Sequence, residues 1–415
     1  MRYYPSPSLL PSATMSTLLS IPLEIRLIIY DFFLVDHKDK IVSNTQPSND
    51  HLVLLDACRQ VEHEAGDLAG FRAYLSLRHE HEISAFLEKA GTHVVARITH
   101  LDVANDGRVI QHPRDDECAP VSQLHRVLEK LPSLQALRVF DCNRTPSLHG
   151  MESNSRLVWS FETAMFPSGK RTGLTSYEFY IAPTTKLVAL HSASGEVIRR
   201  LRLSGLVRLD EPLESCKVLQ HLTIYGVTGN YFDSRPFPPM EKVALHTFQY
   251  GQGDRLGFEM RTTFLVSILS GSHASLRKLV LLHCNKVSTN GLVACLHSLQ
   301  SLEHFALSYI TVNELQANFI EALPLSTHTI KLKIAHARWT FPFYEEEQIL
   351  CDSLKQWMVG PPVTRKELRL CLPHIFKSEE AFSQFTTDAE VDWELMGLKH
   401  GVDVRFGDWE PVEII

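Results

Sequence analysis

The stretch Leu276-Arg-Lys-Leu279-Val-Leu281-Leu-His-Cys284 places apolar residues at spacings of three, two and three, and it continues as Asn-Lys-Val287-Ser288-Thr-Asn-Gly291-Leu292. The alternation in its middle predicts a strand, and the apolar run from Gly291 to Leu296 predicts a helix behind it. A unit of one strand and one helix leaves an apolar face that only similar units can cover. The stretch therefore predicts an α/β fold built from stacked repeats.

Weaker copies of this spacing recur along the chain. Equivalent apolar positions at Leu201, Leu222, Leu279, Phe305 and Leu332 lie 21, 57, 26 and 27 residues apart, and the step of 57 leaves room for one repeat at 246–250. An ordinary α/β domain is the alternative, but it requires these steps to be accidental. Further strands are expected at 98–103, 134–139, 176–180, 367–371 and 402–406, and helices at 124–128, 264–269, 291–296 and 312–320.

This pattern resembles the leucine-rich repeats, and the segment from Leu276 to Leu292 is similar to their cysteine-containing subtype, with Cys284 at the cysteine position. The resemblance implies a horseshoe-shaped solenoid whose parallel strands line a concave face, with helices behind. We assign the solenoid to 90–415. Residues 144–197 fit no repeat well and are interpreted as an irregular insertion.

Composition narrows the class of protein. The 415 residues are 44% apolar and 21% charged, which is typical of a globular chain. The net charge is 41 − 48 = −7, so no basic surplus points to nucleic acid. No run of 18 apolar residues predicts a membrane span. The Pro- and Ser-rich residues 1–15 predict a disordered leader, and the 8 cysteines without a CxxC pair indicate reduced thiols in the cytoplasm or nucleus.

An N-terminal helix is predicted from Ser20 to Val35, with Pro22 in its first turn. At about 100° per residue its apolar residues fall on two arcs rather than one. Two arcs indicate two partners, one of which is the chain's own core. The pattern leaves open which arc is which. The broad arc contains Ile25, Ile28, Ile29, Phe32, Phe33 and Val35, and the narrow arc contains Leu23, Leu27, Tyr30 and Leu34.

A second helix is predicted near 52–68, and its pattern places Leu68 on the apolar side and Glu64 off it. Ile21-Pro22-Leu23-Glu24-Ile25 and the later pair Cys58-Arg59 resemble an F-box, in particular the divergent F-box-like modules of fungal proteins, over 16–75. The resemblance implies binding to a Skp-family adaptor of a cullin–RING ubiquitin ligase. The residues that it assigns to adaptor binding are Pro22, Leu23, Ile25, Ile28, Ile29 and Phe32.

Residues between the last two apolar positions of each repeat strand point from the concave face. Several are basic although the chain is acidic overall, and Arg pairs well with carboxylate and phosphate groups. One hypothesis is a protein substrate with acidic or phosphorylated groups, and the alternative is ordinary solvated strand positions. The candidate substrate-binding residues are Arg138, Arg202, Thr223, Lys333 and Arg369.

No catalytic or metal-binding residue is assigned. His283-Cys284 and Cys295-Leu-His297 contain zinc-type ligands, but Cys284 and Cys295 fill apolar positions of the repeat. No phosphate-binding loop or nucleophile elbow occurs, and no cofactor is implied. We therefore expect a non-catalytic substrate-recognition adaptor of a ubiquitin ligase. The alternative is a repeat scaffold whose N-terminal helices only cap the solenoid, and an enzyme is the third class.

Overall fold

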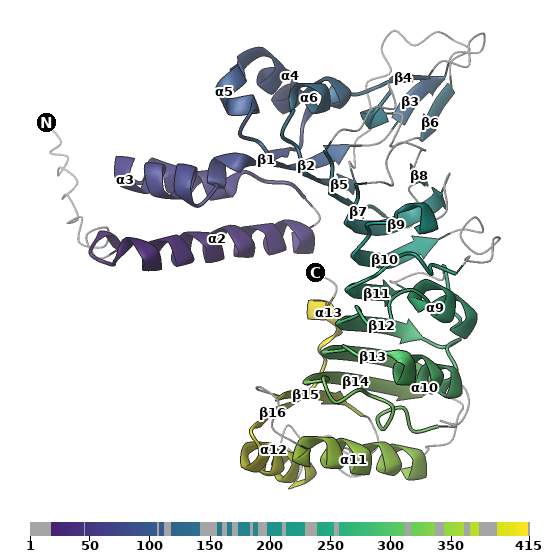
Figure 1. The fold of residues 1–415 in the computed structure, drawn as a ribbon. Coiled ribbons are helices and arrows are strands. Elements are labelled where there is room, and N and C mark those ends of the chain that lie inside the picture. The colour runs from purple at the N-terminus through teal and green to yellow at the C-terminus, as the bar shows by residue number, and fades with distance from the viewer. Residues whose placement is uncertain are drawn as a thin grey trace, which may run out of the picture.

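The fold is that of an α/β protein built on one large parallel sheet, as the computed structural model shows (Figure 1). A path of strands runs from β1 to β16 in chain order, and β8 joins the side of β9 to complete 13 strands. The architecture is consistent with a leucine-rich-repeat-like solenoid. The structure describes residues 18–44, 46–105, 108–111, 118–141, 156–159, 164–167, 173–182, 186–189, 197–209, 213–228, 239–252, 257–311, 317–336, 344–360, 366–372 and 388–413.

Each strand of the large sheet pairs in parallel with its neighbours. The strands are β1 (Tyr74–Leu77), β2 (His100–Asn105), β5 (Ala136–Asp141), β7 (Ser176–Tyr180), β8 (Lys186–Ala189), β9 (Arg200–Leu209), β10 (His221–Thr228), β11 (Thr247–Gly251), β12 (Lys278–Cys284), β13 (His304–Thr311), β14 (Thr329–His336), β15 (Lys366–Cys371) and β16 (Val402–Phe406). A separate antiparallel sheet contains β4 (Cys118–Pro120), β3 (Arg108–Gln111) and β6 (Arg156–Trp159).

Some helices precede the first strand of the sheet in the sequence, and the others follow individual strands. The N-terminal ones are α2 (Leu23–Asn44), η1 (Asp50–Asp56), α3 (Arg59–His63), η2 (Glu64–Leu68) and η3 (Phe71–Ala73). The others are α4 (Glu80–Lys89), α5 (Thr92–Val95), α6 (Leu124–Lys130), η4 (Leu213–Ser215), α9 (Thr262–Leu269), α10 (Thr289–Ser298), α11 (Tyr344–Val359), α12 (Asp388–His400) and α13 (Glu410–Glu413). None of these described helices is long and apolar enough to cross a membrane.

The strands stack in one continuous register. One column of paired residues passes through every strand of the main path, partly buried at Leu75 in β1 and buried in all the other strands: Leu75, Leu101, Leu137, Tyr177, Leu201, Leu222, Phe248, Leu279, Phe305, Ile330, Leu368 and Val404. The backbone just ahead of the strands is also stacked, because an N–H of each repeat donates to a carbonyl of the previous repeat. The first bond of this series runs from the Gln135 N–H to the Thr99 carbonyl at 2.8 Å, and the last from the Glu367 N–H to the His328 carbonyl at 2.9 Å. Repetition of one local geometry therefore builds the sheet.

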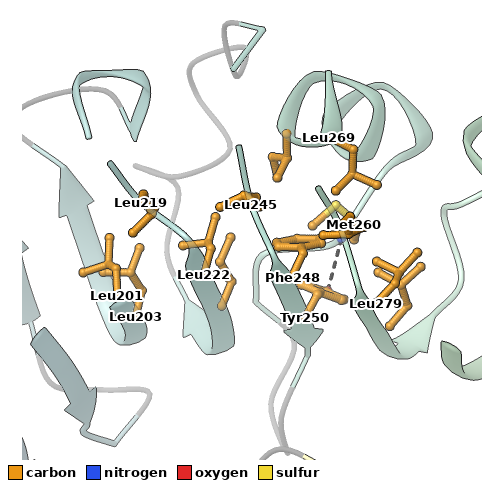
Figure 2. Close-up of a cluster of buried hydrophobic side chains, with 14 of the residues drawn as sticks. Leu201, Leu203, Leu219, Leu222, Leu245, Phe248, Tyr250, Met260, Leu269 and Leu279 are labelled. Carbon is orange, nitrogen blue, oxygen red and sulfur yellow. Dashed lines mark hydrogen bonds between the residues drawn. The ribbon is translucent and has the colours of Figure 1, made fainter. Parts of the chain in front are cut away.

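Buried side chains fill the space between the sheet and the helices. Figure 2 shows the repeat positions of β9–β12 interdigitating with Leu219, Leu245 and Leu269 from the connecting segments. Tyr250 is polar but satisfied, because its hydroxyl donates to the Phe258 carbonyl at 2.7 Å and accepts from the Met260 N–H at 3.1 Å. The core is thus continuous from one repeat to the next.

Neighbouring repeat helices approach closely at Gly291. A Cβ at this position would lie 2.2 Å from the Thr262 methyl group at the start of α9. Ser288 caps α10, because its hydroxyl accepts from the Gly291 N–H at 3.1 Å. The glycine of the sequence pattern is therefore explained by the contact between successive helices, and Ser288 by the hydrogen bond that caps α10.

Three expectations from the sequence are corrected. Ile330, not Leu332, is the repeat position of β14, so the steps after Leu201 are 21, 26, 31, 26 and 25 residues. The expected helix at 52–68 is a 3-10 turn, a short α-helix and a π-turn. This break turns Glu64 inward and leaves Leu68 54% exposed. The described part of the expected helix at 312–320, from residue 317 on, is not helical.

The structure also differs from the predicted bounds of the solenoid, 90–415, and of its insertion, 144–197. The sheet begins at β1, ahead of residue 90, because Tyr74–Leu77 pairs with β2. Within 144–197, β7 occupies a regular place between β5 and β9, whereas β6 joins the separate sheet. The predicted leader, 1–15, lies outside the described residues.

Candidate functional site

The helix α2 has one face buried in its own chain. Tyr30, Leu34 and Ile41 are buried and pack with Phe71, Tyr74 and Phe140, so the core of the N-terminal helices reaches β1 and β5. The narrow arc of the sequence pattern therefore faces the protein, although Leu23 at its end is 36% exposed. This packing fixes the rotation of α2 about its axis.

A buried ion pair fixes the same rotation. Arg26 and Glu64 are 6% and 5% exposed, and Arg26 Nη2 lies 2.6 Å from Glu64 Oε1. The Tyr30 hydroxyl also donates to Glu64, at 3.2 Å. The hydrogen bond from Arg26 lowers the pKa of Glu64 to about 2. Hydropathy alone places both charges on the outside, so pairing explains why they are inside.

The broad arc of α2 faces solvent. Phe32 is 73% and Ile28 is 64% exposed, and the remaining members are 41–47% exposed. Phe33 stacks on Phe71 at 6.2 Å between ring centroids, so its side chain is partly engaged. A group of exposed apolar side chains on one helix face is typical of an interaction surface. The predicted adaptor-binding residues are all exposed: Pro22 directly precedes α2, and Leu23, Ile25, Ile28, Ile29 and Phe32 lie on it.

A polar groove of about 550 Å³ lies between the C-terminal half of α2 and the concave face of β1 to β10. Gln135, Thr175, Arg199 and Gln220 hold equivalent positions ahead of successive strands and line one side of it. Its other lining residues are Val35, Lys38, Asp39, Val42, Tyr74, His100, Asp102, Ala136, Arg138, Ser176, Glu178, Tyr180, Arg200 and His221.

The predicted substrate-binding residue Arg138 lies in this groove but is already paired. Its Nη2 is 2.6 Å from Asp102 Oδ2 and 2.8 Å from the Tyr74 hydroxyl, while the Asp102 side chain is 2% exposed. Burial lowers the pKa of Arg138, but the charge of Asp102, the hydrogen bond to it and the nearby Tyr74 and Tyr180 together raise that pKa above its usual value. Arg138 therefore stabilises the junction of β1, β2 and β5.

The exposed Arg199 and Arg200 differ from Arg138, because neither forms an ion pair with any residue that the structure describes. Burial and then Arg138 lower the pKa of Lys38, and burial and then Arg200 lower the pKa of His221. Neighbouring cations thus add to the effect of burial at Lys38 and His221, while the carboxylates of Asp39, Asp102 and Glu178 also line the groove. Arg199 and Arg200 were missed by the sequence reasoning, although they directly precede Leu201 in its repeat.

The other predicted substrate-binding residues are spread along the concave face. Arg202 is buried between the rings of Tyr180 and Tyr225, 4.3 and 5.4 Å from their centroids. Thr223 donates to Gln249 at 3.0 Å, and Arg369 pairs with Glu367 on its own strand at 2.6 Å. Lys333 shares the concave face but lies one row beyond the expected position, which Lys331 occupies.

The segment after β16 covers the same face of the sheet over β11 to β14. Trp409 is 2% exposed and packs on Val280, Leu282 and Ala306, with Tyr225 beside it. Figure 1 shows α13, in yellow, against β11 to β13 on the side opposite α9 and α10. The Lys333 side chain pairs with Glu410 in this segment. The groove and α13 therefore lie over different parts of the same face of the sheet.

The cysteines Cys284 and Cys295 fill buried positions of the repeat. The thiol of Cys284 is fully buried, which raises its pKa, and burial raises the pKa of Cys295 to about 11. No group of three or more His, Cys, Asp or Glu side chains that could hold a metal ion occurs within the described part of the chain. No known protein-family model matches this sequence, and no curated protein matches it.

Proposed function

We propose that the protein is a non-catalytic substrate-recognition adaptor of a cullin–RING ubiquitin ligase, in which α2 binds a Skp-family adaptor and the concave face binds a protein substrate. The observation that carries this proposal is the division of α2 into a buried narrow arc and an exposed broad arc. The second support is the likeness of 16–75 to the F-box-like modules, to which the exposed residues belong.

A role as a solenoid cap accounts for only half of this helix. A cap needs one apolar face toward the solenoid, and the buried arc with Tyr30 and Leu34 supplies such a face, packing with Tyr74 of β1 and Phe140 of β5. It needs no apolar residue on the opposite side, yet Ile28 and Phe32 are the most exposed members of the broad arc. The scaffold function therefore leaves the broad arc without a role.

The substrate is proposed to carry acidic or phosphorylated groups, since Arg199 and Arg200 face the groove without an ion pair among the described residues. Arg binds planar or tetrahedral oxyanions through paired hydrogen bonds. The chemistry of ubiquitin transfer is assigned to other subunits.

The adaptor role is tested by capture of the purified full chain on an immobilised Skp-family adaptor. We expect native protein to be retained and an Ile28→Asp/Phe32→Asp variant to be lost, because a charge in an apolar interface is costly to desolvate. The matched control is Leu395→Asp/Leu398→Asp on α12, whose side chains are 58% and 78% exposed. Equal retention of all three proteins, or of none, would contradict the proposal.

A further inference from the structure

The segment Asp408–Glu413 binds the concave face much as a separate peptide ligand would. It follows β16 and contains α13. Trp409 fills an apolar patch made of Val280, Leu282 and Ala306, and its side chain is 2% exposed. An aromatic anchor in the centre of a patch is the usual energetic core of a protein interface.

Charges surround this anchor in complementary pairs. The Glu413 side chain is 4% exposed; one of its oxygens lies 2.9 Å from His304 Nε2 and 3.2 Å from Lys278 Nζ, and the other pairs with Lys331. These three partners come from β13, β12 and β14. Burial alone would raise the pKa of Glu413, but the hydrogen bond from His304 and the nearby lysines hold it below its usual value.

Glu410 repeats the arrangement one turn earlier. It pairs with Lys333 of β14 and lies 3.3 Å from His283 of β12, while Asp408 lies 3.4 Å from Lys333. The backbone also takes part, because the Gln249 side chain donates to the Glu413 carbonyl at 3.1 Å. Aromatic, carboxylate and backbone groups are thus all recognised by strands distant in sequence.

Two arginines elsewhere on this face are neutralised within the sheet itself. Arg138 is neutralised by Asp102 from the adjacent strand, and Arg369 by Glu367 from its own strand. The basic residues of β12 to β14 are instead neutralised by carboxylates of the segment after β16. The exception is Glu367 of β15, which lies 3.8 Å from Lys331. Without Asp408–Glu413, this face would present an apolar centre ringed by Lys278, His304, Lys331 and Lys333, which is the composition of a peptide-binding surface.

We infer that the concave face of β11 to β14 is a docking site for an acidic, tryptophan-bearing peptide segment, and that residues 408–413 occupy it as an intramolecular competitor. A partner segment of the same chemistry binds when it displaces them. Intramolecular occupation raises the effective concentration of the competitor, so the site responds only to tight or abundant partners. The inference rests on the proposed function only in assigning partner binding to the concave face, and it does not depend on α2.

The test measures binding of a fluorescein-labelled peptide of residues 406–415 to the full chain by anisotropy. The proteins are the native chain and a Trp409→Ala/Glu413→Gln variant, in which the internal segment is weakened. We expect the peptide to bind the variant at least about tenfold more tightly than the native chain. Adding Lys331→Ala to the variant should weaken binding by about tenfold or more, because a buried charge pair is lost.

The same peptide carrying Trp409→Ala and Glu413→Gln is the ligand control, and it should not bind. Equal binding to the native chain and the variant, or no binding to a variant with a native circular dichroism spectrum, would overturn the inference. If the double variant unfolds, Glu413→Gln alone replaces it and the same comparison decides.

Hydrogen exchange of the native chain gives an independent test. Displacement requires that 408–413 open locally, so their amides should exchange well before those of β12 and β13. Exchange of both regions only together, through global unfolding, would overturn the inference. Capture by the Skp-family adaptor should be unchanged in the variants, so failure here is distinguishable from failure of the proposed function.

Discussion

The two faces of α2 predict opposite outcomes for substitutions only two residues apart. Leu34 is 6% exposed and packs with Val61 and Phe71, whereas Phe32 is 73% exposed. Leu34→Ala should cost about 2–5 kcal/mol, the range for deleting buried methyl groups and leaving a cavity. Phe32→Ala should change stability by about 0.5 kcal/mol or less, since exposed substitutions outside special features have small effects.

Helix propensity does not account for the expected difference in stability between Leu34→Ala and Phe32→Ala. Ala is the best helix former, so both substitutions gain a few tenths of a kcal/mol from the backbone. The remaining contrast of at least about 1.5 kcal/mol comes from burial alone. The assay is urea unfolding followed by circular dichroism, with the slope compared between variants to detect changes in the unfolding transition.

Adaptor binding should show the reverse order. Phe32→Ala removes an exposed aromatic side chain and should weaken capture, while Leu34→Ala should affect capture only through folding. Equal destabilisation by the two variants would place Phe32 in the core of the chain and refute the assignment of the arcs.

Arg138→Met should destabilise the chain by about 3–5 kcal/mol in urea unfolding, because the buried carboxylate of Asp102 loses its partner. The control Arg200→Ala should change stability by about 0.5 kcal/mol or less. Equal effects of the two substitutions would mean that the Arg138–Asp102 pair does not stabilise the junction of β1, β2 and β5. Burial lowers the pKa of His51 from 6.5 to about 4, so the unfolded chain binds the proton first and stability should fall as pH falls through that window. His51→Leu should flatten this dependence in thermal unfolding between pH 7 and 4, and an unchanged slope would exclude His51 as its source. The pKa of Glu64 is lowered from 4.5 to about 2, so its pairing with Arg26 stabilises the fold above pH 4.5, and this stabilisation is lost as pH falls toward 2. Glu64→Gln should therefore reduce the loss of stability in acid unfolding. An acid transition of full size in the variant would contradict this role of Glu64.

Local spacing predicted the repeats because each strand carries its own apolar alternation. The strands at 176–180 and 402–406 match the structure residue for residue. The register of β14 was wrong because Ile330, Leu332 and Ile334 all alternate, and a two-residue shift keeps the same face. Only pairing with β13 distinguishes them.

Long-range pairing explains what the sequence did not reveal about the site. The two arcs of α2 were predictable from helical periodicity, but their orientation depends on Arg26 meeting Glu64 38 residues later. The cover over Lys331 depends on Glu413, 82 residues away. No local pattern contains such contacts, so the neutralisation of Arg138 by Asp102 and of Lys331 by Glu413 could not be predicted.

The most direct test of the adaptor account is hydrogen–deuterium exchange of the full chain, with and without a purified Skp-family adaptor. We expect slower exchange in peptides covering 23–35 when the adaptor is present, and no change in peptides covering α12. Unchanged exchange at 23–35, or protection confined to the solenoid, would contradict the assignment of the exposed arc of α2 as the adaptor-binding surface.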